Sequence, residues 1–178
     1  MTSNKESIVL GGGCFWCLDA SYRLIDGVIS VESGYAGGHV KDPTYDQVCN
    51  GTTGHAEVVR VTFDPEVITL KDVLDIFWAL HDPTTLNKQG NDVGEQYRSI
   101  IFHTSDEQRK IAEESIKEAS LLWEDPIVTD IQPLDVFYLA EKEHQDFFAH
   151  HPESAYCQVI INPKLAKLRE KFASKIKH

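Results

Sequence analysis

Apolar positions along the chain follow two different periods, which predicts a mixture of strands and helices. Short β-branched runs read as strands, and stretches with apolar residues three or four apart read as amphipathic helices. Leu70, Leu74 and Phe77, for example, lie on one face of a predicted helix. Strands are predicted at 8–10, 28–31, 58–63, 99–102 and 127–131, and helices at 14–25, 70–80, 105–123, 139–149 and 164–176.

The order of these elements predicts an α+β fold. We expect a two-layer α/β sandwich with a ferredoxin-like core, a mixed sheet, long loops and a C-terminal extension. Two polar, glycine-containing stretches at 33–54 and 82–96 read as long loops, the first with a helical turn at 45–49. They are expected to meet at one end of the sheet. Because no repeat or linker divides the chain, we expect one catalytic domain over 1–178.

Charge and cysteine content narrow the function classes. The 17 basic and 28 acidic residues give a net charge of −11, which argues against binding to nucleic acid or to an anionic membrane. There is no apolar run of transmembrane length, and the start MTSNKES lacks a signal peptide's hydrophobic segment, so we expect a cytoplasmic protein. In such a reducing compartment the four cysteines favour catalytic, redox or metal-binding roles over structural disulfides.

The run GGGCFWC at 11–17 is the strongest chemical signal in the chain. Glycines between a strand and a helix place Cys14 at the helix N-terminus. Unpaired backbone N–H groups and the helix dipole there are predicted to lower the cysteine pKa and favour a nucleophilic thiolate. Phe15 and Trp16 follow directly and are candidates for the wall of a small apolar pocket beside the sulfur.

Two other readings of the cysteines stay open at this stage. Cys14 and Cys17 form a C-x-x-C pair, which is also typical of a general thiol–disulfide oxidoreductase. A zinc-stabilised binding domain is less favoured, because no second C-x-x-C or H-x-x-H is present and Cys49 and Cys157 fit no zinc module. Three histidines are spaced badly for a shared ligand face and are read as surface residues: His144, His150 and His151.

Several motifs in the right order resemble the methionine sulfoxide reductase A family. They are GGGCFWC, GYAGG at 34–38, PTYDQVCNGTTGHAEVVRV at 43–61, FWALHDPTTLNKQGNDVGEQYRSI at 77–100 and EKEHQDFF at 141–148. The matches run from about residue 7 to 161, nearly the whole chain. The resemblance implies reduction of methionine S-sulfoxide, free or in proteins, to methionine, and hence repair of oxidised proteins.

The family's roles carry over residue by residue. The nucleophile falls on Cys14, and the acid that assists at the sulfoxide oxygen falls on Glu57. Tyr35 and Tyr97 fall where two tyrosines bind that oxygen. The other matches fall on Asp92, an acidic active-site residue, and on Phe15 and Trp16, the methyl-binding wall. A carboxyl group kept protonated by burial is suited to give a proton to a poor leaving oxygen.

The resemblance also implies a cycle in which Cys14 becomes a sulfenic acid that a second cysteine converts to a disulfide. Cys157 is the favoured resolving residue, because it lies where many members carry theirs, in a C-terminal segment able to move. Cys17 is the rival, one helical turn from Cys14, but it lies inside the helix rather than on the substrate side. Cys49 is third and reads as a small buried residue.

The resemblance implies no bound metal or organic cofactor. Thioredoxin, or dithiothreitol in vitro, is expected to supply the reducing equivalents by thiol–disulfide exchange. We expect a monomer whose partners are oxidised proteins or free methionine sulfoxide and thioredoxin, with neither nucleic acid nor membrane.

Overall fold

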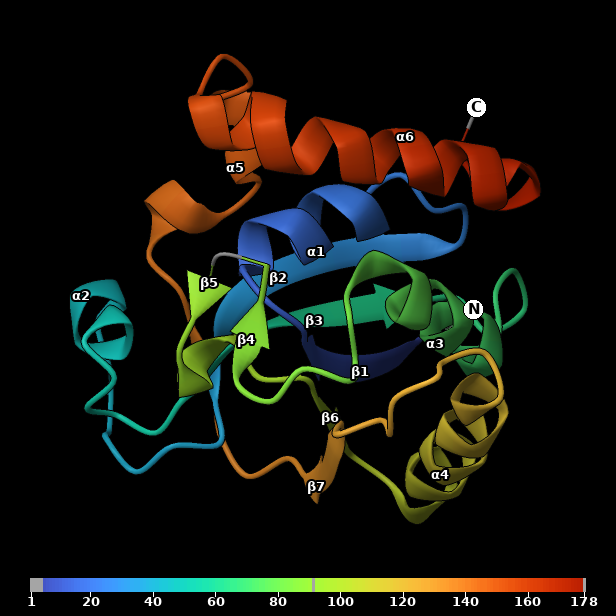
Figure 1. Ribbon diagram of the computed structural model, residues 1–178, viewed down its shortest axis with the longest axis horizontal. Helices are drawn as coiled ribbons and strands as arrows, with labels where there is room; N and C mark the ends of the chain where they lie inside the picture. The colour runs from blue at the N-terminus through green and yellow to red at the C-terminus, as the bar shows by residue number, and fades with distance from the viewer. Residues whose placement is uncertain (1–4, 91, 178) are drawn as a thin grey trace.

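A six-stranded sheet forms the centre of the computed structural model, which describes residues 5–90 and 92–177 (Figure 1). Its strands lie in the order β7-β6-β1-β3-β2-β8. Neighbours are antiparallel except for the parallel pair β6 and β7, so the sheet is mixed as predicted. The strands are β1 (Glu6–Gly11), β2 (Val28–Ala36), β3 (Ala56–Phe63), β6 (Ile100–His103), β7 (Asp130–Pro133) and β8 (Phe137–Leu139).

Helices cover one face of this sheet and confirm the α+β fold. Helices α1 (Phe15–Tyr22) and α3 (Leu70–Leu80) connect the strands of a core ordered β6-β1-β3-β2, the split βαβ arrangement of a ferredoxin-like unit. In Figure 1, α6 (Asn162–Lys171) lies across α1 as an outer layer. Helix α4 (Asp106–Ser120) packs against α3 and the β6–β7 edge, and the short α2 (Tyr45–Cys49) lies in the first long loop.

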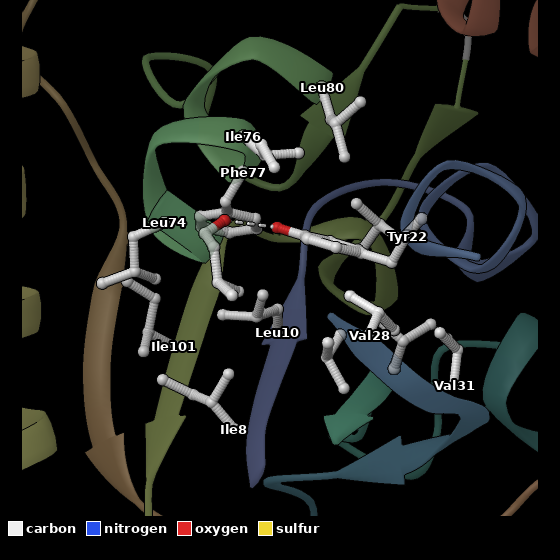
Figure 2. Close-up of a cluster of buried hydrophobic side chains, with 14 of the residues drawn as sticks. Ile8, Leu10, Tyr22, Val28, Val31, Leu74, Ile76, Phe77, Leu80 and Ile101 are labelled. Atoms are coloured by element: carbon white, nitrogen blue, oxygen red, sulfur yellow. Dashed lines mark hydrogen bonds between the residues drawn. The ribbon is translucent and has the colours of Figure 1, made fainter. Parts of the chain in front are cut away.

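The main core lies between the sheet and helices α1 and α3 (Figure 2). Strand β1 shows why both sheet faces are buried: Ile8 and Leu10 point into this core, whereas Val9 joins a smaller cluster on the opposite face. The buried Tyr22 donates its hydroxyl to the Val73 carbonyl at 2.8 Å, so its one polar atom is satisfied. This contact fixes α1 against α3.

Helix α3 agrees with the sequence prediction at both ends. Thr69 and Asp72 form a reciprocal capping box at its start, with the Asp72 N–H donating to the Thr69 hydroxyl at 3.1 Å. Ser105 caps α4 by accepting the Gln108 N–H at 3.2 Å, without the reciprocal bond of a capping box. Helix α4 ends at Ser120 rather than at 123, and α1 ends at Tyr22 rather than at 25.

The strands near the long loops differ from the prediction. Strand β2 continues to Ala36 through residues expected to be loop, because Tyr35 and Ala36 pair with β3 on one side and β8 on the other. Strand β8 was not predicted, since three residues carry too little periodicity. Strand β7 begins at Asp130. The strand predicted at 127–131 therefore started too early, because the prediction included apolar residues that precede the paired segment.

The prediction of a continuous helix at 139–149 is wrong. Asp146 adopts a left-handed conformation with φ of 52°, which interrupts any helix through it. The segment contains only the 3-10 turn η2 (Lys142–His144) and the one-turn α5 (Phe147–His150). The helix predicted at 164–176 starts earlier, with a π-helical turn η3 (Cys157–Ile161) leading into α6, and it ends in a 3-10 turn, η4 (Ala173–Lys175).

The second long loop carries more structure than predicted. It contains a small hairpin of β4 (Lys88–Gln89) and β5 (Asp92–Val93), followed by the 3-10 turn η1 (Glu95–Tyr97). The two long loops do meet, because the Gln96 side-chain amide donates to the Cys49 carbonyl at 3.3 Å. Within the described residues, the search for a helix of sufficient length and apolarity to cross a bilayer finds none.

Candidate active site

Cys14 stands at the turn between β1 and α1 and is the N-cap residue of that helix. Gly13 before it has φ of +87°, a conformation that favours glycine, and its N–H donates to the Tyr97 carbonyl at 3.1 Å. A Cβ on Gly12 would lie 2.9 Å from the His81 ring. The glycines therefore let the second long loop approach the backbone that carries Cys14.

Cys14 itself is a buried thiol, only 7% exposed. Burial, followed by the nearby Glu57 and Cys17, raises the pKa of its thiol well above the usual value. The Trp16 N–H and the Tyr156 hydroxyl act in the opposite direction and do not outweigh burial. The prediction of a thiolate held by the helix start is therefore wrong for the unliganded site, because desolvation exceeds the effect of the helix N-terminus.

Glu57 lies beside Cys14 and has no solvent exposure. One carboxyl oxygen, Oε1, accepts the Phe15 N–H at 3.2 Å. The other, Oε2, has no hydrogen-bond partner among the described residues. Burial raises the Glu57 pKa to about 8, while the Phe15 N–H lowers it. Glu57 is therefore a neutral acid at pH 7 whose free oxygen is available to a ligand.

Tyr35 faces Glu57 across the β2–β3 ladder, where the two residues are direct partners. Its hydroxyl donates to Glu141 Oε1 at 2.9 Å, and the Tyr45 N–H donates to Glu141 Oε2 at 2.9 Å. Burial, then the hydrogen bond to Glu141, raises the Tyr35 pKa far above its usual value, so the phenol keeps its proton. Glu141 therefore fixes the position of a hydroxyl next to the buried acid.

An aromatic group surrounds Phe15 and Trp16 and includes His144, which was expected at the surface. The His144 ring lies 4.2 Å from the Tyr45 ring and 5.8 Å from the Trp16 indole, measured between centroids. Trp16 Nε1–H donates to His144 Nδ1 at 3.2 Å. His144 is only 6% exposed, so the prediction of a surface histidine is wrong. Phe147 stacks on Trp16 at 3.8 Å.

Tyr97 and Asp92 come from the second long loop. The half-buried Tyr97 has a pKa raised by burial and then by Glu57 and Cys14, which places its phenol among these groups. Asp92 Oδ2 accepts the Tyr156 hydroxyl at 3.2 Å, and its charge helps to raise the Glu57 pKa. The site residues named from the sequence thus lie on one end of the sheet.

The other three cysteines occupy different surroundings. Cys17 and Cys157 are buried in one apolar cluster with Ala20, Ile161 and Leu165, formed by α1, η3 and α6. Cys49 is partly exposed at the end of α2, so its reading as a buried residue is wrong. All four cysteines are unpaired.

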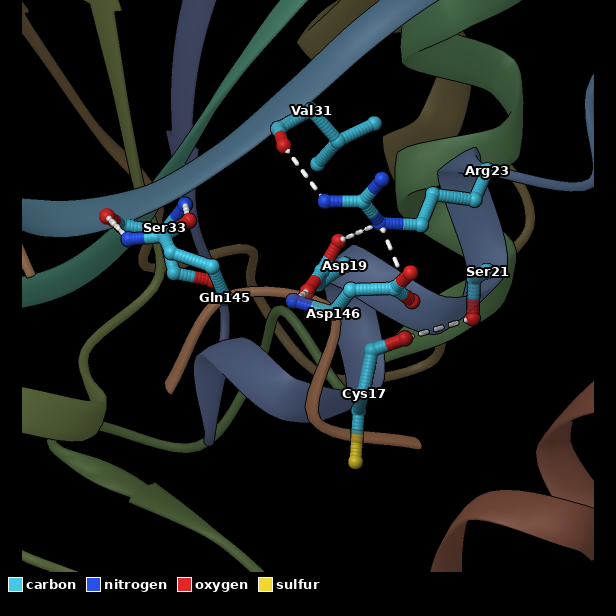
Figure 3. A network of polar contacts seen from close by, with 8 residues as sticks. All are labelled: Cys17, Asp19, Ser21, Arg23, Val31, Ser33, Gln145 and Asp146. Carbon is cyan, nitrogen blue, oxygen red and sulfur yellow. Dashed lines mark hydrogen bonds and ion pairs between the residues drawn. The ribbon is translucent and has the colours of Figure 1, made fainter. Parts of the chain in front are cut away.

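Polar contacts hold the C-terminal segment against α1 and β2 (Figure 3). Gln145 exchanges hydrogen bonds with the backbone of Ser33, at 2.9 Å to its N–H and 2.8 Å to its carbonyl. The buried Asp19 accepts the Asp146 N–H at 2.8 Å and pairs with Arg23. Burial raises the pKa of Asp19 to about 6 despite Arg23. These contacts connect the chain just before Cys157 to the helix that follows Cys14.

Glu141, Glu143 and His144 are the one group of possible metal ligands found within the described residues. Both Glu141 oxygens already accept hydrogen bonds from Tyr35 and Tyr45, and His144 Nδ1 accepts the Trp16 indole. These atoms therefore position the aromatic group, and their geometry gives no separate reason to place an ion there.

A buried thiol beside a neutral buried acid is suited to the chemistry of an oxidoreductase that works through a thiol. The family described as peptide methionine sulfoxide reductase matches residues 6–176. The chain belongs to this family.

Individual relatives agree with the family match. The peptide methionine sulfoxide reductase MsrA of Paenarthrobacter aurescens is 58% identical over 95% of this chain and 97% of its own length. The crystal structure of reduced Mxr1 from Saccharomyces cerevisiae is similar with a TM-score of 0.83 and 39% identity, covering 88% of this chain and 91% of that one. Mxr1 in complex with Trx2 is similar with a TM-score of 0.59 and 31% identity, covering 83% and 87%.

Proposed function

We propose that the protein reduces methionine S-sulfoxide, free or within proteins, to methionine and so repairs oxidised proteins. The observation that carries this proposal is the pairing of Cys14 with Glu57, a buried carboxyl group with one unpartnered oxygen. A sulfoxide oxygen is a poor leaving group until it receives a proton, and Glu57 is protonated below pH about 8. The family match supports the same substrate class.

The first step accounts for a thiol rather than a thiolate at rest. The Cys14 sulfur attacks the sulfoxide sulfur while Glu57 gives its proton to the oxygen. The Cys14 thiol proton then replaces the one that Glu57 lost. The hydroxyl group then passes from the methionine sulfur to the Cys14 sulfur as the new S–S bond and the S–O bond of methionine break. Methionine leaves, and Cys14 carries the oxygen as a sulfenic acid. No net proton is consumed, so a neutral thiol next to a neutral acid is a suitable starting pair.

The surrounding residues receive the roles expected from the sequence. Tyr35 and Tyr97 donate to the oxygen as it gains negative charge. Because the Tyr35 hydroxyl donates to Glu141 in the empty site, binding requires it to turn this proton to the substrate. Phe15 and Trp16 hold the methyl group. Burial keeps Glu57 protonated, and the charge of Asp92 adds to this effect.

The cycle closes with an intramolecular disulfide between Cys14 and the proposed resolving cysteine, Cys157, with Cys17 as the alternative. The position of Cys157 in the short turn η3, just after a segment held by side-chain contacts, supports a role that requires movement. Thioredoxin is the proposed reductant, with no bound cofactor, and the structure of Mxr1 with Trx2 supports a small redox partner. Because the cycle needs reduced thiols, we place it in the cytoplasm. We further propose that one domain, 1–178, acts as a monomer.

Mass spectrometry of a peptide containing methionine S-sulfoxide tests the proposal. The wild-type protein with dithiothreitol is expected to remove one oxygen per peptide, and Cys14→Ser to remove none. Reduction that persists in Cys14→Ser would contradict it. A general thiol–disulfide oxidoreductase would instead reduce a disulfide peptide in preference to the sulfoxide, and would not lose that activity in Glu57→Gln.

A further inference from the structure

The hairpin that carries Asp92 is too short to hold its own position. Strands β4 and β5 have two residues each, and among the described residues they form a sheet of their own, separate from the six-stranded one. An isolated two-stranded hairpin is at best marginally stable in water. Asp92 nevertheless lies close enough to Glu57 for its charge to raise the pKa of that acid. Side-chain contacts must therefore fix the hairpin beside the site.

Gln89 is the direct cross-strand partner of Asp92 in this hairpin. Residues directly opposite each other in an antiparallel pair present their side chains on the same face. The Gln89 side chain packs on the turn that carries Cys14, because a Cβ on Gly13 would lie 3.0 Å from Gln89 Cγ and 3.1 Å from Gln89 Cβ. Gln89 is buried in this contact and only 9% exposed. Asp92 therefore shares the face of the hairpin that meets the Cys14 turn.

The side-chain amide of Gln89 fastens the hairpin to the end of α3. Its Oε1 accepts the Asp82 N–H at 2.8 Å, and its Nε2 donates to the carbonyl of the same residue. Nε2 also donates to the Thr85 hydroxyl at 3.3 Å. Asp82 directly follows His81, the buried C-cap residue of α3. One buried side chain therefore determines where β4 lies relative to a helix of the main fold.

Asp92 has a second contact, which comes from the C-terminal segment. Its Oδ2 accepts the Tyr156 hydroxyl at 3.2 Å. Tyr156 directly precedes Cys157, so this contact belongs to a part of the chain that the proposed disulfide requires to move. Gln89 instead ties Asp92 to α3 and to the turn after β1. Of these two contacts, the one through Gln89 is therefore suited to keep Asp92 in place throughout the reaction.

The charge of Asp92 distinguishes it from the other titratable groups that interact with Glu57. Those groups are thiols and phenols whose pKa values burial raises, so they are neutral at pH 7: Cys14, Tyr35, Tyr45, Cys49 and Tyr97. Asp92 is the carboxylate of the set, and its charge raises the Glu57 pKa. The distance between these two carboxyl groups therefore affects how far above neutral pH Glu57 keeps its proton.

We propose that Gln89 is a positioning residue that holds Asp92 against Glu57 and the Cys14 turn. This role rests on the proposed function, because Glu57 is the acid of that reaction. When the Gln89 amide loses its bonds to Asp82, the hairpin is free to move and the Asp92 carboxylate lies farther from Glu57 on average. The pKa of Glu57 then falls, and less of the acid is protonated above neutral pH. Gln89 acts only through Asp92 and transfers no proton itself.

Gln89→Met tests this role through the pH profile of the reaction. Methionine keeps the length of the side chain and its packing on Gly13, but it makes none of the three hydrogen bonds. Formation of methionine from methionine S-sulfoxide is measured by rapid quench in a single turnover, between about pH 6 and pH 9. The variant is expected to keep its rate near pH 6 within about twofold, and to lose several-fold near pH 9, because the falling limb moves to lower pH. A purely structural defect would lower the rate by the same factor at every pH.

Three further variants separate the role of Gln89 from other effects. Asp92→Asn removes the charge itself and is expected to move the falling limb in the same direction. Adding Gln89→Met to Asp92→Asn is expected to move it no further, because both changes act through one carboxylate. Gln89→Asn is one methylene too short to reach Asp82, so it should repeat the shift, and it replaces Gln89→Met if that variant does not fold. Gln132→Met, the same substitution at an exposed position of β7, is the matched control and should give the wild-type profile.

Amide exchange provides a second measurement that does not depend on activity. In Gln89→Met, exchange in β4 and β5 is expected to accelerate by about tenfold, with β1 unchanged. Unchanged exchange in the hairpin, or a falling limb that stays at the wild-type pH, would overturn the role of Gln89. If the wild-type protein forms no methionine, the proposed function fails instead, and the exchange comparison still decides whether Gln89 holds the hairpin.

Discussion

The end of the sheet that holds Cys14 and Glu57 differs from the C-terminal segment 137–177 in how it is held. Glu57 lies in β3, which is hydrogen-bonded to β1 on one side and β2 on the other. The C-terminal segment contains a three-residue strand, short helical turns and α6, fastened in part by side chains such as Gln145. Attack on a sulfoxide needs fixed geometry, whereas disulfide formation between Cys14 and Cys157 needs movement of the C-terminal segment. The two regions suit these two tasks.

The difference also predicts where the protein opens first. Local opening costs least where few backbone hydrogen bonds and few apolar contacts must break. Segment 141–157 has few backbone hydrogen bonds to break, since the left-handed Asp146 separates its two short turns. Its apolar contacts are made by a few side chains, such as Phe147 on Trp16. Opening there would expose Cys157 while leaving the β1–β3 frame of Cys14 and Glu57 intact.

Glu57→Gln tests the fixed region and has the largest expected effect. Glutamine keeps the size of the side chain and an acceptor for the Phe15 N–H, but it has no acidic proton. We expect single-turnover methionine formation to slow by about 10²–10⁴-fold, the usual contribution of a general acid. Rapid-quench measurement of methionine checks this. A loss smaller than about tenfold would move the acid elsewhere.

The pH dependence sharpens the same assignment. With the Glu57 pKa at about 8, single-turnover methionine formation should be level up to that pH and fall above it, and the fall should vanish in Glu57→Gln. The folded-state pKa is raised above the ordinary 4.5, so stability is lost as pH rises from 4.5 toward 8. The loss is about 1.4 kcal/mol per pH unit at most. Urea unfolding at both ends of this window should show a smaller loss in Glu57→Gln than in wild type, because Asp19, whose pKa is raised to about 6, contributes to the loss in both proteins.

The fold could be predicted where burial imposes a period. Strand β1 was located from its short apolar run, which is buried on both faces of the sheet, and α3 from its one apolar stripe. The same reasoning failed at 139–149, because its structure depends on contacts distant in sequence. Asp146 is held left-handed next to Asp19, and Gln145 bonds to Ser33. No local pattern encodes either contact.

The candidate site shows the same limit. Cys14 was found from its glycines, and Glu57, Tyr35, Tyr97 and Asp92 came from the family resemblance rather than from residue patterns. The direction of the Cys14 pKa shift was predicted incorrectly. The position at the helix start favours a thiolate, but burial raises the Cys14 pKa, and the motif GGGCFWC does not show how buried the thiol is. Glu141 and His144 were missed, although the motif EKEHQDFF that contains them was noticed. Their role depends on Tyr45, which is far away in sequence.

Gln145→Ala tests the C-terminal segment and should leave the fixed region unchanged. It removes three hydrogen bonds and leaves the Ser33 N–H and carbonyl, as well as the Ala140 carbonyl, without this partner. The Ser33 carbonyl still accepts the Ala140 N–H at 2.9 Å. Leaving a buried group unpaired costs about 1–3 kcal/mol, so amide exchange in 141–157 should accelerate by about tenfold or more. Exchange followed by mass spectrometry measures this effect.

The control for this variant is Gln132→Ala. Gln132 is exposed. Within the described residues, its side chain forms hydrogen bonds only with the Asp130 carboxylate. It should leave exchange in 141–157 unchanged. If Gln145→Ala instead accelerated exchange throughout β1 and β3, the segment would not open separately and the contrast between the two regions would fail.

Ser105→Ala has the smallest expected effect. It tests whether either region responds to a loss of stability elsewhere in the protein. Ser105 caps α4, which packs on α3 and the β6–β7 edge, away from Cys14 and Cys157. Losing an N-cap serine costs about 1 kcal/mol, which lowers the Tm of a chain of this size by about 2–4 °C. Calorimetry measures this shift.

Methionine formation and exchange in 141–157 should stay at wild-type values at 25 °C, because a cap lost elsewhere weakens only the global unfolding equilibrium. A change in either would mean that these regions respond to overall stability, and their different behaviour in the other variants could no longer be assigned to local structure.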